Sequence, residues 1–175
     1  MIHAGGHPRT GLATLLTLLS GALVGCSTPD APGVAEAATC TLPADDVARI
    51  QDLEAHHEGQ VQRSDFDAMA ALLDDGIMLM VPNQPDIVGK SQVREWQKAW
   101  EELTFKSYAQ TVESIVGCGD LAYVKMSYSM SIAPLGAADL ISDSGRGIHI
   151  LRKRSDGAWV ITHHFFSSDR PDSTG

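Results

Sequence analysis

A change in the spacing of hydrophobic residues near Thr104 constrains the fold of this chain more than any other feature. Before it, apolar side chains recur every three or four residues, which is the spacing of amphipathic helices. After it they alternate one by one, which is the spacing of strands. Within 121–133 the alternating apolar set is Ala122, Val124, Met126, Tyr128, Met130 and Ile132. This pattern predicts an α+β fold whose sheet is buried on one face.

The second half of the chain is expected to contain four long strands. Turn residues divide it into strands at about 104–116, 121–133, 146–154 and 158–167, and a looser loop covers 134–144. The first half is expected to hold three helices. Each of them has its own start or stop signal.

The first helix begins near Pro43, a residue suited to a first helical turn. The second helix is expected to have Ser64 as its N-cap and to end at Asp74-Asp75-Gly76, and Ser91 is expected to cap the third. Between the last two helices, 76–81 reads as a strand that is apolar, and therefore covered, on both faces.

Several apolar side chains near this strand are candidates for lining a cavity. Met78, Met80 and Val81 come from the strand itself, and Trp96 comes from the third helix. Trp96 and its neighbour Trp100 are read either as lid or core residues or as ligand contacts.

Composition restricts the class of partner. The chain has 175 residues, of which 43% are hydrophobic and 20% charged, and its formal net charge is −9. This is the composition of one ordinary globular domain. Because it lacks a basic run and its surface is acidic, we expect no binding to nucleic acid.

The first residues are typical of an export signal. Gly11 to Gly25 is uncharged and mostly apolar, and it is too short to span a bilayer as a helix. It ends in Leu23-Val24-Gly25-Cys26, which resembles the lipobox of bacterial lipoproteins; a plain signal peptide with an incidental cysteine is the alternative. In the lipoprotein interpretation, 1–25 is the signal peptide and Cys26 is lipidated. In cells with an outer membrane, the resemblance to lipoprotein sorting rules implies that Ser27 after the cysteine directs the protein to that membrane, facing the periplasm.

Residues 26–40 are rich in Pro, Ala and Gly and are expected to form a lipid-anchored flexible tether. Two further cysteines, Cys40 and Cys118, would then lie in an oxidising compartment, where an even pair is read as a disulfide. Two unpaired, partly buried thiols are the alternative.

Three fragments of the chain carry a family resemblance. DFDAMAALLDDGIMLMVPNQPDIVGKSQVREW resembles the front of a SnoaL-like or DUF4440 domain, and GDLAYV, RSDGAWVIT and FFSSDRP resemble its back. The resemblance places a domain at 41–171, with a disordered tail at 172–175. It implies the cone-shaped fold of the nuclear transport factor 2-like (NTF2-like, or ketosteroid isomerase-like) superfamily, in which three N-terminal helices pack into a curved, mostly antiparallel sheet. It also implies a homodimer formed through the exposed sheet face.

The same resemblance argues against steroid-isomerase chemistry. The ketosteroid isomerases use a carboxylate base on the first strand, and that position falls here on Val81, or on Met80 if the register shifts by one. Neither side chain accepts a proton, so whether the chain is an enzyme is left open.

Histidines occupy the other positions that matter in this superfamily. His57 lies on the buried stripe of the first helix and also falls at the tyrosine position of the isomerases, and His149 falls at their acid position. On the last strand, Thr162, His164 and Phe166 are expected to face the cavity and His163 the opposite side. The remaining wall would be formed by Met78, Met80, Met126 and Tyr128.

Four interpretations of His57, His149 and His164 follow from the sequence. They are half-buried groups satisfied by carbonyls or water, or they orient the polar end of a small, largely apolar ligand. The third interpretation is acid–base catalysis, as in an isomerase or dehydratase, and the fourth is a tris-imidazole metal site. Glu54 either orients His57 or lies on a solvated helix face. We favour small-molecule binding, with no cofactor and no assigned metal ligand; a non-catalytic dimeric interaction module is a further alternative.

Overall fold

The computed structural model describes residues 40–170. The expected signal peptide, Cys26, most of the expected tether and the tail therefore lie outside the described residues. Within the part that is described, no helix is long and apolar enough to cross a membrane.

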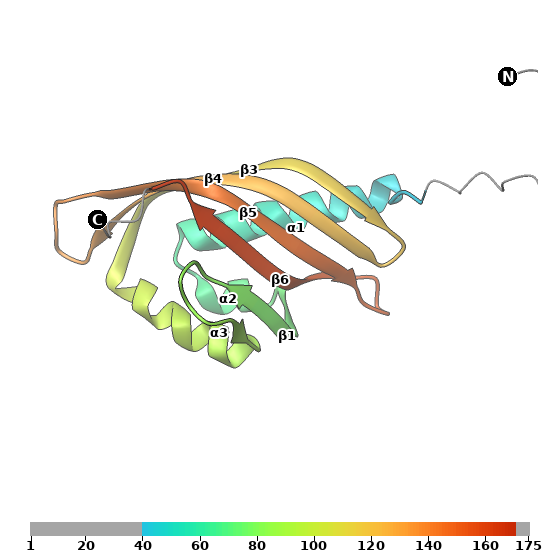
Figure 1. Ribbon diagram of the computed structural model, residues 1–175, viewed down its shortest axis with the longest axis horizontal. Helices are drawn as coiled ribbons and strands as arrows, with labels where there is room; N and C mark the ends of the chain where they lie inside the picture. Colours follow the sequence, from blue (N-terminus) through green and yellow to red (C-terminus); the bar gives the residue numbers. More distant parts are fainter. Residues whose placement is uncertain (1–39, 171–175) are drawn as a thin grey trace, which may run out of the picture. The chain divides into compact units, whose positions relative to one another are not determined.

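The described chain has three α-helices, a short 3₁₀ helix and six strands. In order they are α1 (Ala44–Gln62), α2 (Phe66–Ala70), β1 (Leu73–Met80), β2 (Ile87–Val88), α3 (Lys90–Gln97), η1 (Lys98–Glu102), β3 (Leu103–Cys118), β4 (Leu121–Pro134), β5 (Ile141–Lys153) and β6 (Trp159–Ser168). The strands form one sheet in the order β2-β1-β6-β5-β4-β3 (Figure 1). Only the β1–β6 pair is parallel. The α+β fold predicted from the sequence is confirmed.

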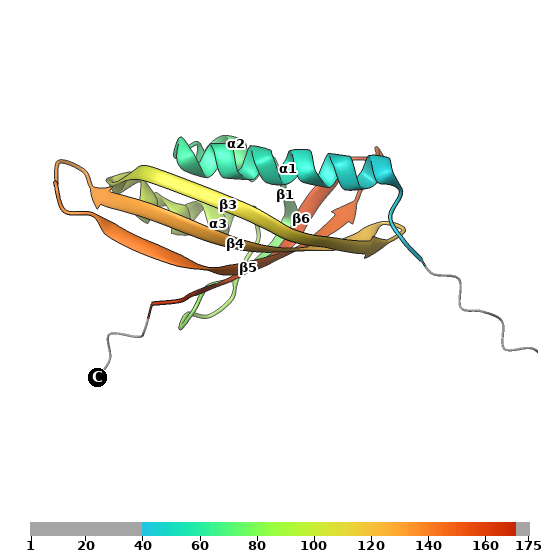
Figure 2. The ribbon, with the colours of Figure 1, turned by 90° about the horizontal axis from the view of Figure 1, so that it is seen from above.

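The helices lie on one side of the sheet, and the core fills the space between. Figure 2 shows α1 lying along the strands of the sheet, with α2 next to the C-terminal part of α1. Alternation in β4 sends Ala122, Val124 and Met126 toward this side, where each is at most 2% exposed. The largest cluster of buried residues joins α1 and α3 to β1, β4, β5 and β6; its members are Ile50, Leu53, Leu73, Ile77, Leu79, Val93, Ala122, Val124, Met126, Leu151, Trp159 and Ile161.

Two helix starts differ from the expectation. Ser64 adopts a left-handed backbone (φ 57°), and Asp65 is the N-cap of α2 in its place, with its carboxylate accepting a hydrogen bond from the Ala68 amide at 3.0 Å. Gly89 rather than Ser91 is the N-cap of α3; its φ of 91° is open to glycine without a steric penalty.

The two aspartates expected to end the second helix belong instead to β1. The Asp74 carboxylate accepts a hydrogen bond from the Gly76 amide at 2.9 Å, and Asp75 pairs with Lys90 at 3.0 Å. α2 is only five residues long, so the chain enters the sheet earlier than its helical pattern suggests. β5 also starts earlier, at Ile141, inside the expected loop.

The first turn of α1 is held against the last strands by Asp46. This carboxylate is 4% exposed; it accepts hydrogen bonds from Lys153 Nζ at 2.9 Å and from the indole of Trp159 at 3.2 Å. A side chain that suits the positive end of the helix dipole thus also fixes where the helix lies on the sheet. This contact sets the position of Glu54 and His57 further along the helix.

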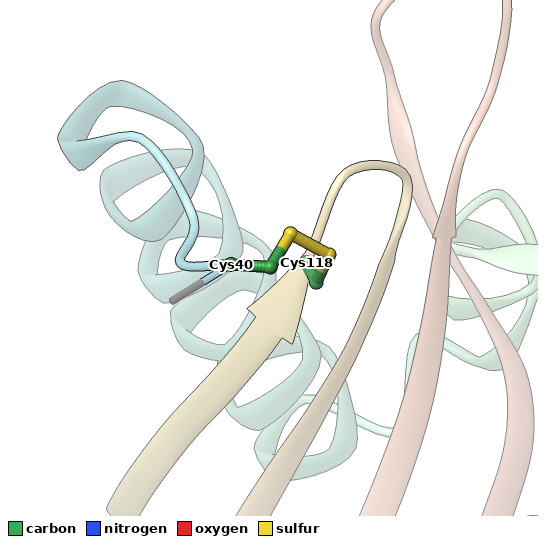
Figure 3. The surroundings of a disulfide bond; sticks show 2 residues. All are labelled: Cys40 and Cys118. Carbon is green, nitrogen blue, oxygen red and sulfur yellow. A yellow bond between two sulfur atoms is a disulfide. The ribbon is translucent and has the colours of Figure 1, made fainter. Parts of the chain in front are cut away.

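A disulfide joins Cys40, just before α1, to Cys118 at the end of β3 (Figure 3). The two Cα atoms are 5.2 Å apart although 78 positions separate the residues in sequence. The bridge therefore ties the start of the described chain to the turn between β3 and β4.

Candidate functional site

A cavity of about 100 Å³ lies between the helices and the inner face of the sheet. Engineered cavities of about 150 Å³ bind benzene, so the space suits a group near the size of one ring. Its walls are mainly aliphatic and aromatic: His57, Val61, Phe66, Met69, Leu73, Ile77, Leu79, Val93, Trp96, Gln97, Trp100, Phe105, Tyr108, Met126, Tyr128, Met130, Gly147, His164 and Phe166.

Three imidazole rings from three different elements meet beside this cavity. His57 comes from α1, His149 from β5 and His164 from β6, and pairing of β5 with β6 puts His149 directly opposite His164. The ring centroids are 4.3 Å apart for His149 and His164, 4.9 Å for His57 and His149, and 5.7 Å for His57 and His164, all in edge-on arrangements. His57 and His164 line the cavity, and His149 lies behind them with no exposed surface.

A buried network of hydrogen bonds holds two of the rings. Nδ1 of His149 lies 2.9 Å and 3.0 Å from the two carboxylate oxygens of Glu54, which is itself 1% exposed. The same carboxylate accepts a hydrogen bond of 2.7 Å from the side-chain amide of Gln110. The carbonyl oxygen of that amide faces Nδ1 of His57 at 3.3 Å and accepts from the Tyr108 hydroxyl at 3.2 Å.

This network fixes the tautomers. A carboxylate only accepts, so the nitrogen of His149 that faces Glu54 carries a proton. The side-chain NH2 of Gln110 donates to Glu54, and the carbonyl oxygen of the same amide faces His57. That oxygen only accepts, so Nδ1 of His57 also carries a proton. When either ring is neutral, its Nε2 is left as a hydrogen-bond acceptor. Nε2 of His149 is buried and has no hydrogen-bond partner among the described residues.

Electrostatics keep the two cavity-lining rings neutral. Burial, reinforced by the charge of His149, lowers the pKa of His57 to about 4. Burial and the two neighbouring histidines likewise lower the pKa of His164 well below 6.5. For Glu54, burial alone would raise the pKa, but the charge and hydrogen bond of His149 outweigh it and lower the pKa below 4.5. The two cavity-lining imidazoles are therefore neutral, and the Glu54 carboxylate is ionised.

Comparison with known families gives one match that covers most of the described chain. Residues 53–162 match the SnoaL-like domain, and this span includes most of α1 and runs into β6. The chain belongs to the SnoaL-like domain family. A search of curated proteins found no match.

Solved structures show the same fold for this SnoaL-like domain. A ketosteroid isomerase-like protein from Erwinia carotovora atroseptica is 22% identical, covers 74% of this chain and 100% of its own, and has a TM-score of 0.67. A nuclear transport factor 2-like protein from Salmonella enterica serovar Typhimurium is 15% identical over 75% of this chain and 96% of its own, with a TM-score of 0.61. A candidate dehydratase of the NTF2-like family from Streptomyces avermitilis is 16% identical over 74% and 100%, with a TM-score of 0.60. At these identities the likeness establishes the fold and not the activity.

The structure brings six of the expected site residues to the cavity. His57, Trp96, Met126, Tyr128, His164 and Phe166 all line it. Trp100, which the sequence left between core and ligand contact, lines it as well.

Three expected lining residues from the first strand do not line the cavity. Ile77 and Leu79 face it instead, and they are 1% and 3% exposed. Because neighbouring side chains in a strand point to opposite faces, Met78 and Met80 lie on the far side of β1. Val81 shares the face of Ile77 and packs against the core without lining the cavity. The cause is an irregularity in β1 between Leu73 and Met78. Because of it, the residues that face the cavity cannot be found by counting alternate positions from the end of the preceding helix.

Thr162 differs from the expectation for a similar reason. A bulge in β6 opposite Ile150 and Leu151 interrupts the alternation, and the Thr162 hydroxyl donates to the Ile150 carbonyl at 3.1 Å instead of facing the cavity. His163 lies one residue on, with Nδ1 3.1 Å from that hydroxyl, outside the cavity lining.

Three polar residues of the site were missed in the sequence. Gln110 and Tyr108 lie two residues apart on β3, and Gln97 lines the cavity with its carbonyl oxygen buried and unpartnered within the described chain. The alternation of Tyr108, Gln110 and Val112 was the available signal for the first two. Glu54 also has a different role from the one expected, because its partner is His149 and it is not solvated.

The arrangement favours recognition of an apolar body with one polar group. Within the described part of the SnoaL-like domain, the cavity lining includes neither Asp nor Glu, so no carboxylate base faces the ligand space. Chemistry there would depend on the imidazoles, which present acceptors and, in the neutral form, no charge.

Proposed function

We propose that this SnoaL-like domain binds a small, largely apolar molecule in the cavity between helices and sheet. The observation that carries the proposal is the lining itself: a wall of aliphatic and aromatic side chains with His57 and His164 at its polar part. Ligand sites commonly combine such walls with a few placed polar groups that fix orientation.

The hydrogen-bond inventory restricts the ligand further. His57 lines the cavity, and its Nε2 is an acceptor in the neutral ring, whereas the Tyr108 hydroxyl already donates to Gln110. A buried acceptor without a partner costs about 1–3 kcal/mol, so a ligand that donates here is favoured. We therefore expect a ring-sized molecule that carries a hydroxyl or amine group.

Native mass spectrometry of the purified protein tests this proposal. A bound molecule is expected to co-purify and to be released by organic solvent. Substitution Met130→Trp, which fills the cavity from β4, is expected to abolish the bound mass, whereas Ser129→Trp, one residue away on the exposed face, is expected to retain it. An empty wild-type protein that also shows no thermal shift with a panel of single-ring alcohols, phenols and amines would contradict the proposal.

A proton-transfer enzyme of the isomerase or dehydratase type is the second candidate. The observation in its favour is the pairing of His149 with Glu54, since a carboxylate that orients an imidazole is a common device for general acid–base catalysis. Incubation with the co-purified molecule or its dehydration product, followed by mass analysis, tests it. Turnover that persists in His149→Gln would show that the His149–Glu54 pair takes no part in proton transfer.

We also propose that the domain is held at a membrane by lipidated Cys26, in the outer membrane facing the periplasm. Support comes from the lipobox-like Leu23-Val24-Gly25-Cys26 and from Ser27 after it. Metabolic labelling with a fatty acid is expected to mark the wild type and not Cys26→Ser. Label in both proteins would exclude acylation at this cysteine.

Homodimerisation through the outer sheet face completes the proposal. Val116, Tyr123, Ile148 and Phe165 lie on that face and are 49%, 43%, 40% and 43% exposed. They occupy neighbouring strands, with Val116 paired to Tyr123 and Ile148 to Phe165. Exposed apolar side chains gathered on one sheet face are typical of an interaction site, although Lys125 lies opposite Ile148 between the two pairs.

A further inference from the structure

The three histidines beside the cavity have the arrangement of a metal site. One ring nitrogen from each of His57, His149 and His164 lies within 4.8 Å of the others. Each ring comes from a different element, so the cluster is built by the tertiary fold and not by a single helix or turn. Such convergence brings acceptor lone pairs together in a place with little water.

The surroundings of the rings supply the second requirement of a metal site. Histidines that bind metals usually donate the other ring N–H to a carboxylate or carbonyl oxygen, which fixes the tautomer and turns the free nitrogen to the ion. His149 donates Nδ1–H to Glu54, and His57 donates Nδ1–H to the carbonyl oxygen of Gln110. Glu54 in turn orients Gln110, so one buried carboxylate sets both ligands.

The unpartnered nitrogen of His149 points to the kind of group that is bound. This Nε2 is buried and has no partner within the described residues, and in the neutral ring it is an acceptor. Only an electron-poor group can satisfy it: a proton donor or a cation. A ligand hydroxyl reaches one acceptor, or at most two, whereas a metal ion accepts lone pairs from all three rings.

We propose that His57, His149 and His164 bind a divalent transition-metal ion of the zinc type, with Glu54 and Gln110 as positioning residues. Neutral imidazoles are preferred ligands for Zn²⁺ and its neighbours. Three protein ligands leave a fourth position open, as in catalytic zinc sites. His57 and His164 line the apolar cavity, so an oxygen of the bound molecule could complete the coordination from there. The inference concerns the same cavity as the proposed function but does not depend on which organic ligand it holds.

The geometry requires a modest adjustment. With Zn–N bonds of about 2.0–2.1 Å, tetrahedral ligand nitrogens lie about 3.4 Å apart. The nitrogens here lie within 4.8 Å, so the rings must close by at most about 1.4 Å at the widest pair. His164 makes no side-chain hydrogen bond to the described residues, so no such bond has to break when it turns toward the other two. The carboxylate of Glu54 offsets part of the added charge.

Metal content and a cobalt spectrum test the proposal directly. The full chain would carry Cys26→Ser, so that the bonded pair Cys40 and Cys118 leaves no free thiol as a competing ligand, and a tag without histidine. After treatment with EDTA, addition of Zn²⁺ is expected to give one ion per chain that survives dialysis. Addition of Co²⁺ is expected to give the visible absorption of a four-coordinate site. No organic ligand is added, so failure here leaves the ligand-binding proposal standing.

The neighbouring histidines offer matched controls. His57→Ala and His164→Ala are expected to lose dialysis-stable zinc and the cobalt spectrum, whereas the adjacent His56→Ala and His163→Ala keep both. Glu54→Gln is expected to weaken zinc affinity by about 10–100-fold while retaining the stoichiometry. Circular dichroism checks that each variant is folded, and His164, which is half-buried, provides the variant least prone to misfolding.

Two results would overturn the proposal. One is the absence of stoichiometric zinc in the folded wild-type chain. The other is zinc that is retained in folded His164→Ala, or lost equally in His163→Ala, because the ion would then lie elsewhere.

Discussion

Glu54 is the residue on which the site depends most. It is 1% exposed, and its carboxylate bonds both His149 and Gln110, so it connects the helix to two strands through charged hydrogen bonds. Charge-assisted bonds of this kind are about twice as strong as neutral ones. Through Glu54, α1 therefore fixes the positions of His149 and Gln110.

Removal of this carboxylate is expected to destabilise the protein strongly. Glu54→Ala leaves His149 and Gln110 without their partner in a dry interior, and we expect a loss of about 3 kcal/mol in the free energy of unfolding. Asp52→Ala, on the exposed side of the same helix, is the control and is expected to change it by less than about 0.5 kcal/mol. Urea unfolding measures both. Equal effects of the two substitutions would show that the buried network contributes nothing.

The lowered pKa of His57 predicts acid sensitivity in the metal-free protein. The unfolded chain takes up a proton at this side chain below pH 6.5, but the folded chain resists it down to about pH 4. Stability is therefore full above pH 6.5 and is lost as pH falls from 6.5 toward 4, by up to about 3 kcal/mol. The groups that face the ring are His149, His164, Glu54 and the amide of Gln110.

Urea unfolding at pH 7 and pH 5 in the presence of EDTA checks this expectation. His57→Gln is expected to lose clearly less stability over this interval than the wild type. His56→Gln, at an exposed position, is expected to behave as the wild type. A wild type with equal stability at the two pH values would contradict the assignment.

At the scale of single residues, the sequence identified the histidines but not what holds them. His57 lies on a helical stripe and His164 on an alternating strand, whereas His149 was placed in the cavity by the family resemblance. Glu54 and Gln110 are ordinary charged and polar residues whose roles depend on a contact across 56 positions of sequence. Because no local pattern encodes that contact, the hydrogen bonds that hold the imidazoles were not predicted, and no metal ligand was assigned.

Among the elements, β1 shows where counting by period fails. The strand starts at Leu73, before the point at which the helical pattern ends, and it is irregular up to Met78. A shift of one residue exchanges the two faces of a strand, so the methionines were placed in the cavity in error and Ile77 and Leu79 were overlooked. Strand β4, which has an unbroken alternation and paired neighbours on both sides, followed its pattern.

Gly145 lies where β5 passes very close to β6 and to the side chain of Tyr128 on β4. A Cβ at this position would overlap the carbonyl oxygen of Ser167 and come within 2.7 Å of the Tyr128 hydroxyl. Gly145→Ala is therefore expected to lower the free energy of unfolding by about 2 kcal/mol or more. At Gly76 the nearest atom would be 3.5 Å away, so Gly76→Ala is expected to be tolerated. Thermal unfolding of both variants compares the positions; a stable Gly145→Ala would mean that the strands separate easily.

For the molecule as a whole, the apolar outer face of the sheet predicts a dimer. Light scattering is expected to give twice the chain mass for the wild type, and Ile148→Glu is expected to give a monomer because it places a charge in the centre of that face. Val88→Glu is the control, since Val88 is 52% exposed but lies on β2 at the other edge of the sheet. A monomeric wild type at high concentration would exclude this interface.

The order of elements across the molecule was predicted from the sequence, and the pairing of strands was not. Helical spacing before Thr104 and alternation after it were enough for the fold class. The parallel contact between β1 and β6 joins residues far apart in sequence, as does the bulge at Thr162, and both depend on the assembled sheet. These are the features that set the shape of the cavity.

The disulfide between Cys40 and Cys118 has a mechanical consequence. When the chain is pulled from a point ahead of Cys40 against a partner bound to the sheet, the disulfide carries the force into the turn between β3 and β4. The helix α1 lies inside the closed loop and outside this path of force. Glu54 and His57 are therefore insulated from pulling on the chain, and the site keeps its geometry under tension.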